Sequence, residues 1–355
     1  MGCFLFTQCL ESSYQSSDNR LKILRAISSD VVLAHYEEFT VLSDALAQET
    51  AALCADLTVE RLESARQAWW DARGRWKRAE VVTFGPVVEY PARLGPRIDH
   101  WPVKSDAVEE LIESDESLSP EEFQRRGTAT RGLPVVEYLL WGEGDLMSTL
   151  AALSDDPRRC AALASTSVDI HTNATQLASA WRDEWIDLVN PTGGEEEGKF
   201  ENEQEVIVEW VNRLSFTVEN VRVVKFEKPL GDLSPEDVRP DIIESRSSGR
   251  SIEDARDALR GVIDVWRGTG EEGQLNGLKF LIVDRRVVNL IDGLFDEATT
   301  ALDLLEDPLE LLTTDHRAEL DQAINALKAL QSGLQTELAE STQATIRFND
   351  TTDGD

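Results

Sequence analysis

Hydrophobic residues recur at spacings of three and four along most of the chain, which is the pattern of amphipathic helices. The spacing predicts helices over the following ranges: 21–55, 62–82, 105–113, 154–189, 203–225, 251–267, 277–306, and a last helix that carries Leu320, Ile324, Leu327, Leu330, Leu334 and Leu338. Strand signals are scarce. Residues 221–226 alternate as a short strand would, but they continue a helical pattern. The sequence therefore predicts an all-α fold.

Local signals set several helix ends. Thr58, Ser119 and Ser251 each stand where an N-cap is expected, and Pro120 and Pro157 stand where proline is tolerated in a first turn. The run 84–86, Phe-Gly-Pro, ends the second predicted helix, because glycine caps and proline cannot continue. Residues 87–103 are proline-containing and predict an irregular connection.

One stretch has the composition of a linker. Residues 190–198 combine proline, three glycines and three consecutive glutamates, which favours a solvated connection. We therefore expect two packed helical bundles, residues 23–190 and 201–348, joined by a linker at 191–200. Residues 1–22 are expected to be a leader remnant or a disordered N-terminus, and residues 349–355 a disordered tail.

Charge changes the picture of partners. The 355 residues contain 67 Asp and Glu against 35 Lys and Arg, for a net charge of −32. Such a surface repels phosphates and anionic lipid, so nucleic acid is not expected as a partner. An acidic, lysine-poor surface is typical of a halophilic protein that must stay soluble in high salt, where screening removes self-repulsion. Sequestration of cations is the alternative explanation.

Four cysteines are present, with no metal-binding spacing among them. Cys54 and Cys160 allow a disulfide in an oxidising compartment, but each lies among small apolar residues, which favours buried free thiols. No segment reaches the roughly 18 apolar residues of a membrane span. The short apolar run before Cys9 has no basic start. One hypothesis is that it is the end of a leader and that a lipid on Cys9 tethers the protein to a membrane; the alternative is that it carries no anchor.

The most distinctive stretch is residues 131–142, Arg-Gly-Leu-Pro-Val-Val-Glu-Tyr-Leu-Leu-Trp-Gly, whose helix begins near Gly132. Three other segments accompany it: the Trp/Arg run 69–76 before Phe-Gly-Pro, the run 97–102 (Arg-Ile-Asp-His-Trp-Pro), and the run 244–251 (Glu-Ser-Arg-Ser-Ser-Gly-Arg-Ser). Together, in this order, they resemble the imelysin-like family, over roughly residues 24–347. That family's helix opens with Gly-x-His-x-x-Glu.

The resemblance implies an all-helical cell-envelope protein of two domains, often associated with iron uptake and classed as metallopeptidase-like. In this chain Pro134 replaces the family's histidine, while Glu137 is retained. A His and a Glu three residues apart share a helix face and can ligate one ion, whereas proline offers no donor. One carboxylate alone makes a weak metal site. His100, in the preceding loop, is the only substitute ligand we consider.

Two interpretations of Glu137 remain open. As a site residue it is expected to face Arg131 or Ser245 across the contact between the bundles. As a structural residue it is expected to pair with an arginine such as Arg73. Glu244 and Ser245 belong either to the same pocket or to an ordinary loop. Four tryptophans also have two interpretations, as part of the core or as an aromatic floor for a ligand: Trp69, Trp70, Trp76 and Trp141.

The prediction is a cell-envelope protein, periplasmic or lipid-anchored, that binds a small ligand or a metal ion without catalysis and is linked to iron uptake. No cofactor is certain, although the resemblance implies a divalent metal or iron. Two alternatives remain: a metal-dependent peptidase that uses Glu137 as general base, and a structural or interaction protein with a vestigial site.

Overall fold

The protein is almost entirely helical in the computed structural model, which describes residues 18–142, 144–189, 200–231, 239–270, 274–305 and 317–347. No β-strand occurs in these ranges. Only an isolated bridge joins Val189 to Phe200. The all-α prediction is confirmed.

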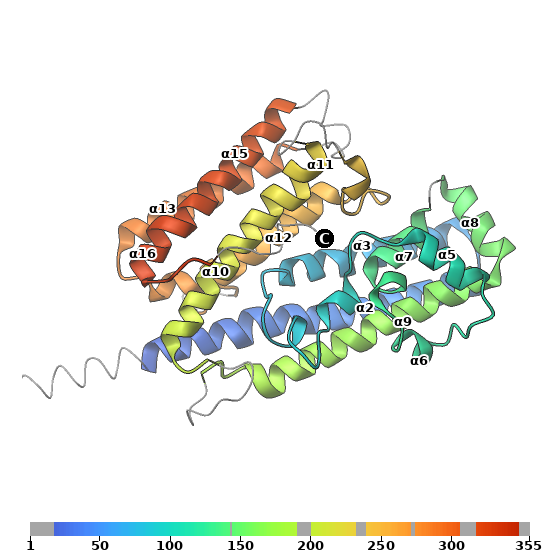
Figure 1. The fold of residues 1–355 in the computed structure, drawn as a ribbon, viewed down its shortest axis with the longest axis horizontal. Coiled ribbons are helices and arrows are strands. Elements are labelled where there is room, and N and C mark those ends of the chain that lie inside the picture. The colour runs from blue at the N-terminus through green and yellow to red at the C-terminus, as the bar shows by residue number, and fades with distance from the viewer. Residues whose placement is uncertain are drawn as a thin grey trace, which may run out of the picture.

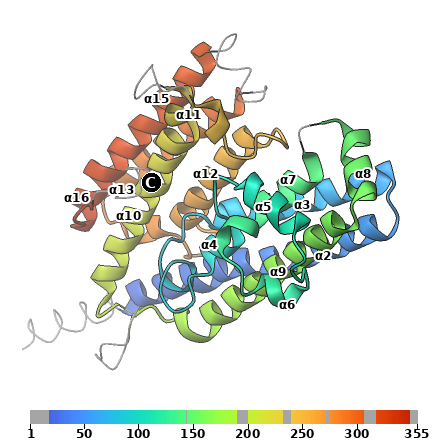
Figure 2. The ribbon, with the colours of Figure 1, turned by 45° about the vertical axis from the view of Figure 1, so that its right-hand side comes forward.

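The helices lie in two groups that meet along α3 and α12 (Figure 1). The first group comprises a helical segment 18–26 with a π-helical turn Ile27–Leu33, α2 (Ala34–Ala55), α3 (Val59–Ala79), α4 (Gly95–Ile98), α5 (Ser105–Glu113), α6 (Pro120–Phe123), α7 (Leu133–Trp141), α8 (Leu146–Asp155) and α9 (Pro157–Ala180), which ends in the π-helical turn Trp181–Trp185. Within it, the long helices α2, α3 and α9 pack side by side (Figure 2).

The second group is built on four long helices. It comprises α10 (Glu203–Arg222) with the π-helical turn Val223–Glu227, α11 (Lys228–Leu230), α12 (Ser251–Arg267), α13 (Arg285–Asp303), α15 (Arg317–Gly333) with the π-helical turn Leu334–Leu338, and α16 (Ala339–Thr342). Short 3₁₀ turns connect several of these elements, at Gly85–Val87, Thr128–Thr130, Pro240–Ile242 and Leu278–Leu281.

Several predicted boundaries are confirmed. The acidic helix spans Ser105–Glu113 as expected, and Thr58 caps α3 by accepting a hydrogen bond from the Arg61 amide at 3.3 Å. The alternating residues 221–226 are helical, so the neighbouring helical pattern dominates the local β-propensity of the valines.

Other boundaries differ. The helix expected from residue 277 starts at Arg285, because the side chain of Asp284 accepts a hydrogen bond from the Arg286 amide and fixes the start there. Ser251 is the first residue of α12 and does not cap it. Its hydroxyl donates to the Glu244 carbonyl at 2.6 Å. The sequence interpretation also missed α8, which begins after Asp145.

Helices α3 and α12 approach closely enough to join the two groups. A Cβ on Gly261 of α12 would lie 2.0 Å from the Arg78 carbonyl oxygen of α3, so only glycine fits at this crossing. The buried apolar side chains form one continuous core that includes Trp69 of α3 and Trp266 of α12. Packing against α12 thus places one face of α3 at the contact between the groups. The polar residues of α3 meet those of the second group there.

The predicted division into two domains stays a prediction. Residues 191–199 of the predicted linker 191–200 and both ends of the chain fall outside the described residues, and Cys9 lies in the N-terminal one. Within the described ranges, none of the helices combines the length and the apolar character needed to span a bilayer.

The expectation of free thiols at Cys54 and Cys160 is wrong, because the two form a disulfide between α2 and α9. Their Cα atoms lie 5.5 Å apart, in the usual range for this bond. The sequence signal was misjudged because small apolar neighbours suit a disulfide between packed helices as well as they suit a buried thiol.

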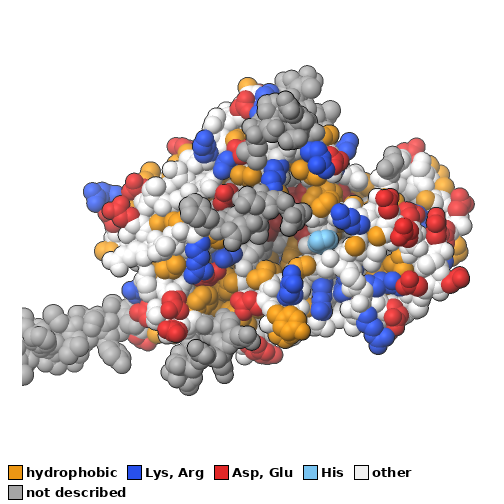
Figure 3. Space-filling model, viewed as in Figure 1, with side chains coloured by type: hydrophobic (Ala, Val, Ile, Leu, Met, Phe, Trp, Pro, Cys, Tyr) orange, Lys and Arg blue, Asp and Glu red, His pale blue; other side chains and the backbone are white. Residues whose placement is uncertain are grey.

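Acidic side chains are not spread evenly over the surface. On the face shown in Figure 3, Asp and Glu gather at the end of the first group where α5 and α8 lie. Basic side chains are scattered over both groups on this face.

Candidate functional site

The helix that carries the most distinctive sequence stretch is α7. Its N-cap, Gly132, has φ of 92°, a conformation that side chains rarely adopt, and a Cβ there would lie 2.6 Å from the Ile98 carbonyl oxygen. Pro134 falls in the first turn, where its missing N–H costs no helical hydrogen bond. Glu137 follows one turn later and is only 4% exposed. The local sequence therefore places a carboxylate inside the protein.

Ser248 is the hydrogen-bonding partner of Glu137. Its backbone amide and its hydroxyl donate to Oε1 of Glu137 at 2.9 and 2.8 Å. Ser248 lies in the turn that precedes α12, so this contact joins the first helix group to the second. The predicted site segments 131–142 and 244–251 thus meet in space.

Burial raises the pKa of Glu137 to about 7, although the hydrogen bonds from Ser248 and the positive charge of Arg73 act in the opposite direction. At neutral pH its carboxyl group is therefore divided between the protonated and the ionised form. Among the described residues, no ion pair to Glu137 is present.

Arg73 of α3 is the centre of a buried ionic network beside this contact. Its guanidinium reaches three carboxylates: Asp99 at 2.7 Å, Asp254 at 3.0 Å and Glu244 at 3.3 Å. The first comes from the loop after α4 and the other two from the second helix group. Because Arg73 is 1% exposed, these pairs replace the water that its charge has lost.

Glu244 lies between two lysines as well. Lys77 of α3 contacts its Oε1 at 2.8 Å, and Lys225 of the π-helical turn contacts its Oε2. Burial alone would raise the pKa of Glu244, but Lys225, Lys77 and Arg73 together hold that pKa well below its usual range. This carboxylate is therefore ionised at any pH near neutrality.

Asp254 closes the network on the side of α12. It accepts hydrogen bonds from the Ser245 hydroxyl at 2.6 Å and from Arg250, which also reaches Asp257 at 2.7 Å. Ser245 has φ of 51°, an uncommon value for a residue other than glycine. Several residues of the turn 244–250 thus contact charged side chains, and these contacts fix the conformation of the turn.

The structure brings together some of the predicted site residues and separates others. Arg73, Glu244 and Ser245 share the network. Arg131 does not face Glu137: it pairs with Asp169 of α9 at 2.8 Å and donates to backbone carbonyls of the loop before α7. The expected ion pair between Glu137 and Arg73 is not formed either, because three other carboxylates occupy that guanidinium.

The donors at this site do not fit a tight metal centre. Within the described ranges, no group of three His, Cys, Asp or Glu residues could hold a metal ion. Pro134 provides no ligand beside Glu137, and no contact joins His100 to Glu137 in this part of the chain. The suggestion of His100 as a substitute ligand gains no geometric support.

Sequence interpretation missed five participants: Lys77, Asp99, Ser248, Arg250 and Asp254. Two signals were available. Lys77 stands one helical turn after Arg73, on the same face of α3, and Ser248 lies within the quoted run 244–251. Trp69 and Trp76 are buried in the core, and Trp70 and Trp141 are partly buried and pack against it.

Known proteins share this arrangement of helices. The Imelysin family model matches residues 32–334. The chain is 25% identical over 260 residues to iron-regulated protein A of Synechococcus elongatus, covering 71% of this chain and 67% of that protein. Two crystal structures share the fold at 18% identity: an imelysin-like protein from Psychrobacter arcticum and a putative iron-regulated protein A precursor from Parabacteroides distasonis. Their TM-scores are 0.76 and 0.77; the alignments cover 94% and 92% of this chain, and 98% and 95% of theirs. Because the family model spans most of its length, the chain belongs to the imelysin family.

Proposed function

We propose that this protein is a non-catalytic binding protein of the cell envelope, linked to iron acquisition, that holds its ligand at the contact between Glu137 and Ser248. The observation that carries the proposal is the state of the carboxylates. Asp99, Glu244 and Asp254 are each paired with a cation, whereas among the described residues Glu137 is held only by Ser248. Glu137 is therefore the acid left for a ligand.

The chemistry of this carboxyl group limits what it can take. No described residue donates to its Oε2, so the ligand gains one acceptor oxygen. A small positively charged ligand fits, as does an iron ion that arrives with most of its own ligands. A bare ion that needs several protein donors does not. Because the pKa of Glu137 is about 7, binding of a cation there releases a fraction of a proton near neutral pH.

Two further observations support the envelope and the link to iron. The disulfide between Cys54 and Cys160 is typical of oxidising compartments. One structural neighbour is described as a precursor, and both it and the Synechococcus elongatus relative are described as iron-regulated. A lipid at Cys9 as the tether remains part of this proposal.

Peptidase activity is the second candidate, because a carboxyl group with a pKa of about 7 suits a general base. Hydrolysis also needs a polarised carbonyl or an activated water. Three basic residues of the neighbouring network, Arg73, Lys77 and Arg250, are already engaged by carboxylates. The binding function therefore accounts for more of the geometry.

The test compares wild type with Glu137→Gln and Pro134→His. Ferrous and zinc ions are titrated calorimetrically, and cleavage of unstructured protein substrates is measured in parallel. We expect weak binding of a divalent ion by wild type, loss of it in Glu137→Gln, tighter binding in Pro134→His, and no cleavage. Tighter binding is expected because a histidine three residues before Glu137 restores a second donor on the same helix face.

Each other outcome has a defined meaning. Cleavage by wild type that disappears in Glu137→Gln and with chelator would establish the peptidase instead. Equal ion binding by all three proteins would place the binding elsewhere and overturn the assignment to Glu137. No binding of either ion, even by Pro134→His, would favour a vestigial site with a structural role.

A further inference from the structure

A turn of the second helix group covers Glu137. Because this residue is 4% exposed, a ligand from solvent reaches its carboxyl group only if part of the surrounding chain moves. Helices α3, α5, α8 and α9 pack against α7, and the turn before α12 contributes Ser248, which donates twice to Oε1 of Glu137. A surface turn opens at a lower cost in free energy than a packed helix. The turn is therefore the part of the cover that can open.

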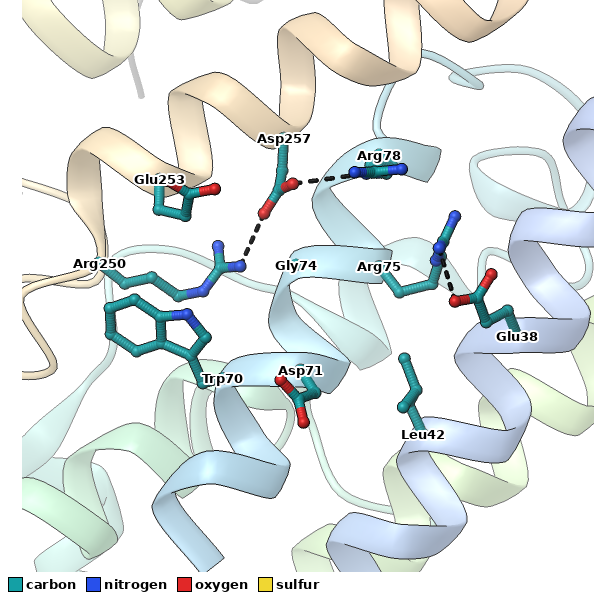
Figure 4. A pocket seen from close by; sticks show the side chains of 10 residues that line it. All are labelled: Glu38, Leu42, Trp70, Asp71, Gly74, Arg75, Arg78, Arg250, Glu253 and Asp257. Carbon is teal, nitrogen blue, oxygen red and sulfur yellow. Dashed lines mark hydrogen bonds and ion pairs between the residues drawn. The ribbon is translucent and has the colours of Figure 1, made fainter. Parts of the chain in front are cut away.

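The base of this turn is fixed in the buried ionic network. The Arg250 amide donates to the Ser245 carbonyl at 3.0 Å and closes a loop of four residues, 246–249. Ser245 is fully buried, and its hydroxyl donates to Asp254. Arg250 is 3% exposed and pairs with Asp254 and Asp257, and Figure 4 shows its guanidinium directed toward Asp257. An opening movement is thus confined to residues 246–249.

The tip of the turn faces solvent. Arg246, Ser247 and Gly249 are exposed, whereas Ser248 is partly buried against Glu137. A Cβ placed on Gly249 would meet no atom within 4 Å. Gly249 has φ of 72°, a backbone conformation that glycine adopts and leaves at little cost. A glycine directly after Ser248 is therefore suited to be the hinge on which Ser248 moves away from Glu137.

We propose that residues 246–249 form a lid over Glu137, hinged at Gly249 and held closed by the two hydrogen bonds of Ser248. This inference rests on the proposed function, because it concerns how a ligand reaches the carboxyl group of Glu137. Ser248 and the ligand compete for that group, so the ligand binds the open form. Its apparent affinity is then reduced by the small fraction of molecules in which the lid is open.

Amide hydrogen exchange of the full chain, without added ligand, tests whether the lid opens. The Ser248 amide is released by the opening, whereas the amide of Leu259, in the middle of α12, is released by unfolding of the helix. After correction for intrinsic rates, we expect Ser248 to exchange at least roughly 100-fold faster than Leu259 and with little dependence on low urea concentrations. Equal protection and equal urea dependence of the two amides would overturn the lid.

Zinc titration of wild type and Gly249→Ala tests whether the lid limits access to the site. Alanine at a φ of 72° raises the free energy of the closed turn, while the open space around residue 249 accommodates its methyl group. We expect the open fraction, and with it the affinity for zinc, to rise about fivefold. A turn with a merely structural role would lose stability on this substitution without any gain in affinity.

Gly142→Ala is the matched control. Gly142 follows α7 with φ of 57°, and a Cβ there also meets no atom within 4 Å, so alanine destabilises the fold at a position outside the lid. Its affinity for zinc should equal that of wild type. Unchanged or weaker binding by Gly249→Ala, or an equal gain in both variants, would overturn the proposal. If none of the three proteins binds zinc, the proposed function fails at Glu137, whereas the exchange of Ser248 still decides whether the lid opens.

Discussion

Two carboxyl groups at the contact between the helix groups have pKa values shifted in opposite directions. Glu137 is 4% exposed and Glu244 has 14% of its side chain exposed, so both have lost most of their water. The pKa of Glu137 is raised to about 7, whereas that of Glu244 is held well below its usual range. Burial acts on both in the same direction. The difference lies in their neighbours.

Glu244 is flanked by Lys77, Lys225 and Arg73, whose charges outweigh the cost of its burial. Glu137 receives two hydrogen bonds from Ser248, but no cation from the described part of the chain contacts it directly. The first carboxylate is fixed as an anion and holds the helix groups together. The second gains and loses its proton near physiological pH, so its protonation state can respond to a ligand.

Removal of one of the cations beside Glu244 should cause the largest loss of stability. Lys77→Met leaves Asp99 and Glu244 with less positive charge in a buried place, and we expect a loss of about 3–5 kcal/mol in the free energy of unfolding at pH 7. Denaturation with urea measures it.

The control for this prediction is Lys22→Met, which removes an exposed lysine and should cost less than about 1 kcal/mol. If Lys77→Met cost no more than this control, the remaining cations alone would satisfy Glu244, and the contrast with Glu137 would not depend on the number of positive neighbours.

The second prediction concerns pH. A carboxyl group whose pKa is raised from 4.5 to about 7 on folding binds its proton more tightly in the folded state, so stability is highest at low pH and falls as pH rises to about 7. Glu137 should therefore contribute a decrease of about 3 kcal/mol between pH 4.5 and pH 7. Glu137→Gln should remove this decrease.

The opposite shift of Glu244 keeps the two effects apart. A depressed pKa stabilises the protein above the unfolded value, near 4.5, and that stability is lost only as pH falls below it. Burial also raises the pKa of Asp169 and Glu219, but both residues are present in the variant, so the difference between wild type and Glu137→Gln in urea denaturation at several pH values between 5 and 8 reports Glu137. A wild-type curve that coincides with that of Glu137→Gln across this window would contradict the raised pKa.

The sequence predicted the helices well and the partners of the site poorly. Periodicity locates α5 and the start of α3 because both depend on local spacing and caps. The partner of Glu137 depends instead on how α7 meets the turn before α12, 111 residues later. No local pattern encodes that distance, so the expected partners were Arg131, Ser245 or Arg73, whereas the fold supplies Ser248.

The same limit explains Arg131 and Arg73. Both are arginines within recognisable motif segments, and only three-dimensional packing assigns the first to Asp169 and the second to the network between the groups. The choice between a disulfide and free thiols at Cys54 also depends on the packing of α2 against α9. What the sequence could have given is Lys77, because its spacing from Arg73 is helical and local.

The smallest predicted effect concerns the two hydrogen bonds that Glu137 receives from Ser248. Ser248→Ala removes the hydroxyl donor to Oε1 and keeps the backbone donor, so the anion of Glu137 loses one of its two hydrogen bonds. Since that hydroxyl lowers the pKa of Glu137, its loss should move the pKa upward and cost about 1 kcal/mol at pH 8, where the anion prevails. At pH 5, where the carboxyl is protonated, the cost should be smaller. Ser247→Ala, at the exposed neighbouring position, serves as control and should show no dependence on pH. Equal losses at both pH values would mean that Ser248 stabilises the turn before α12 and not the charge on Glu137.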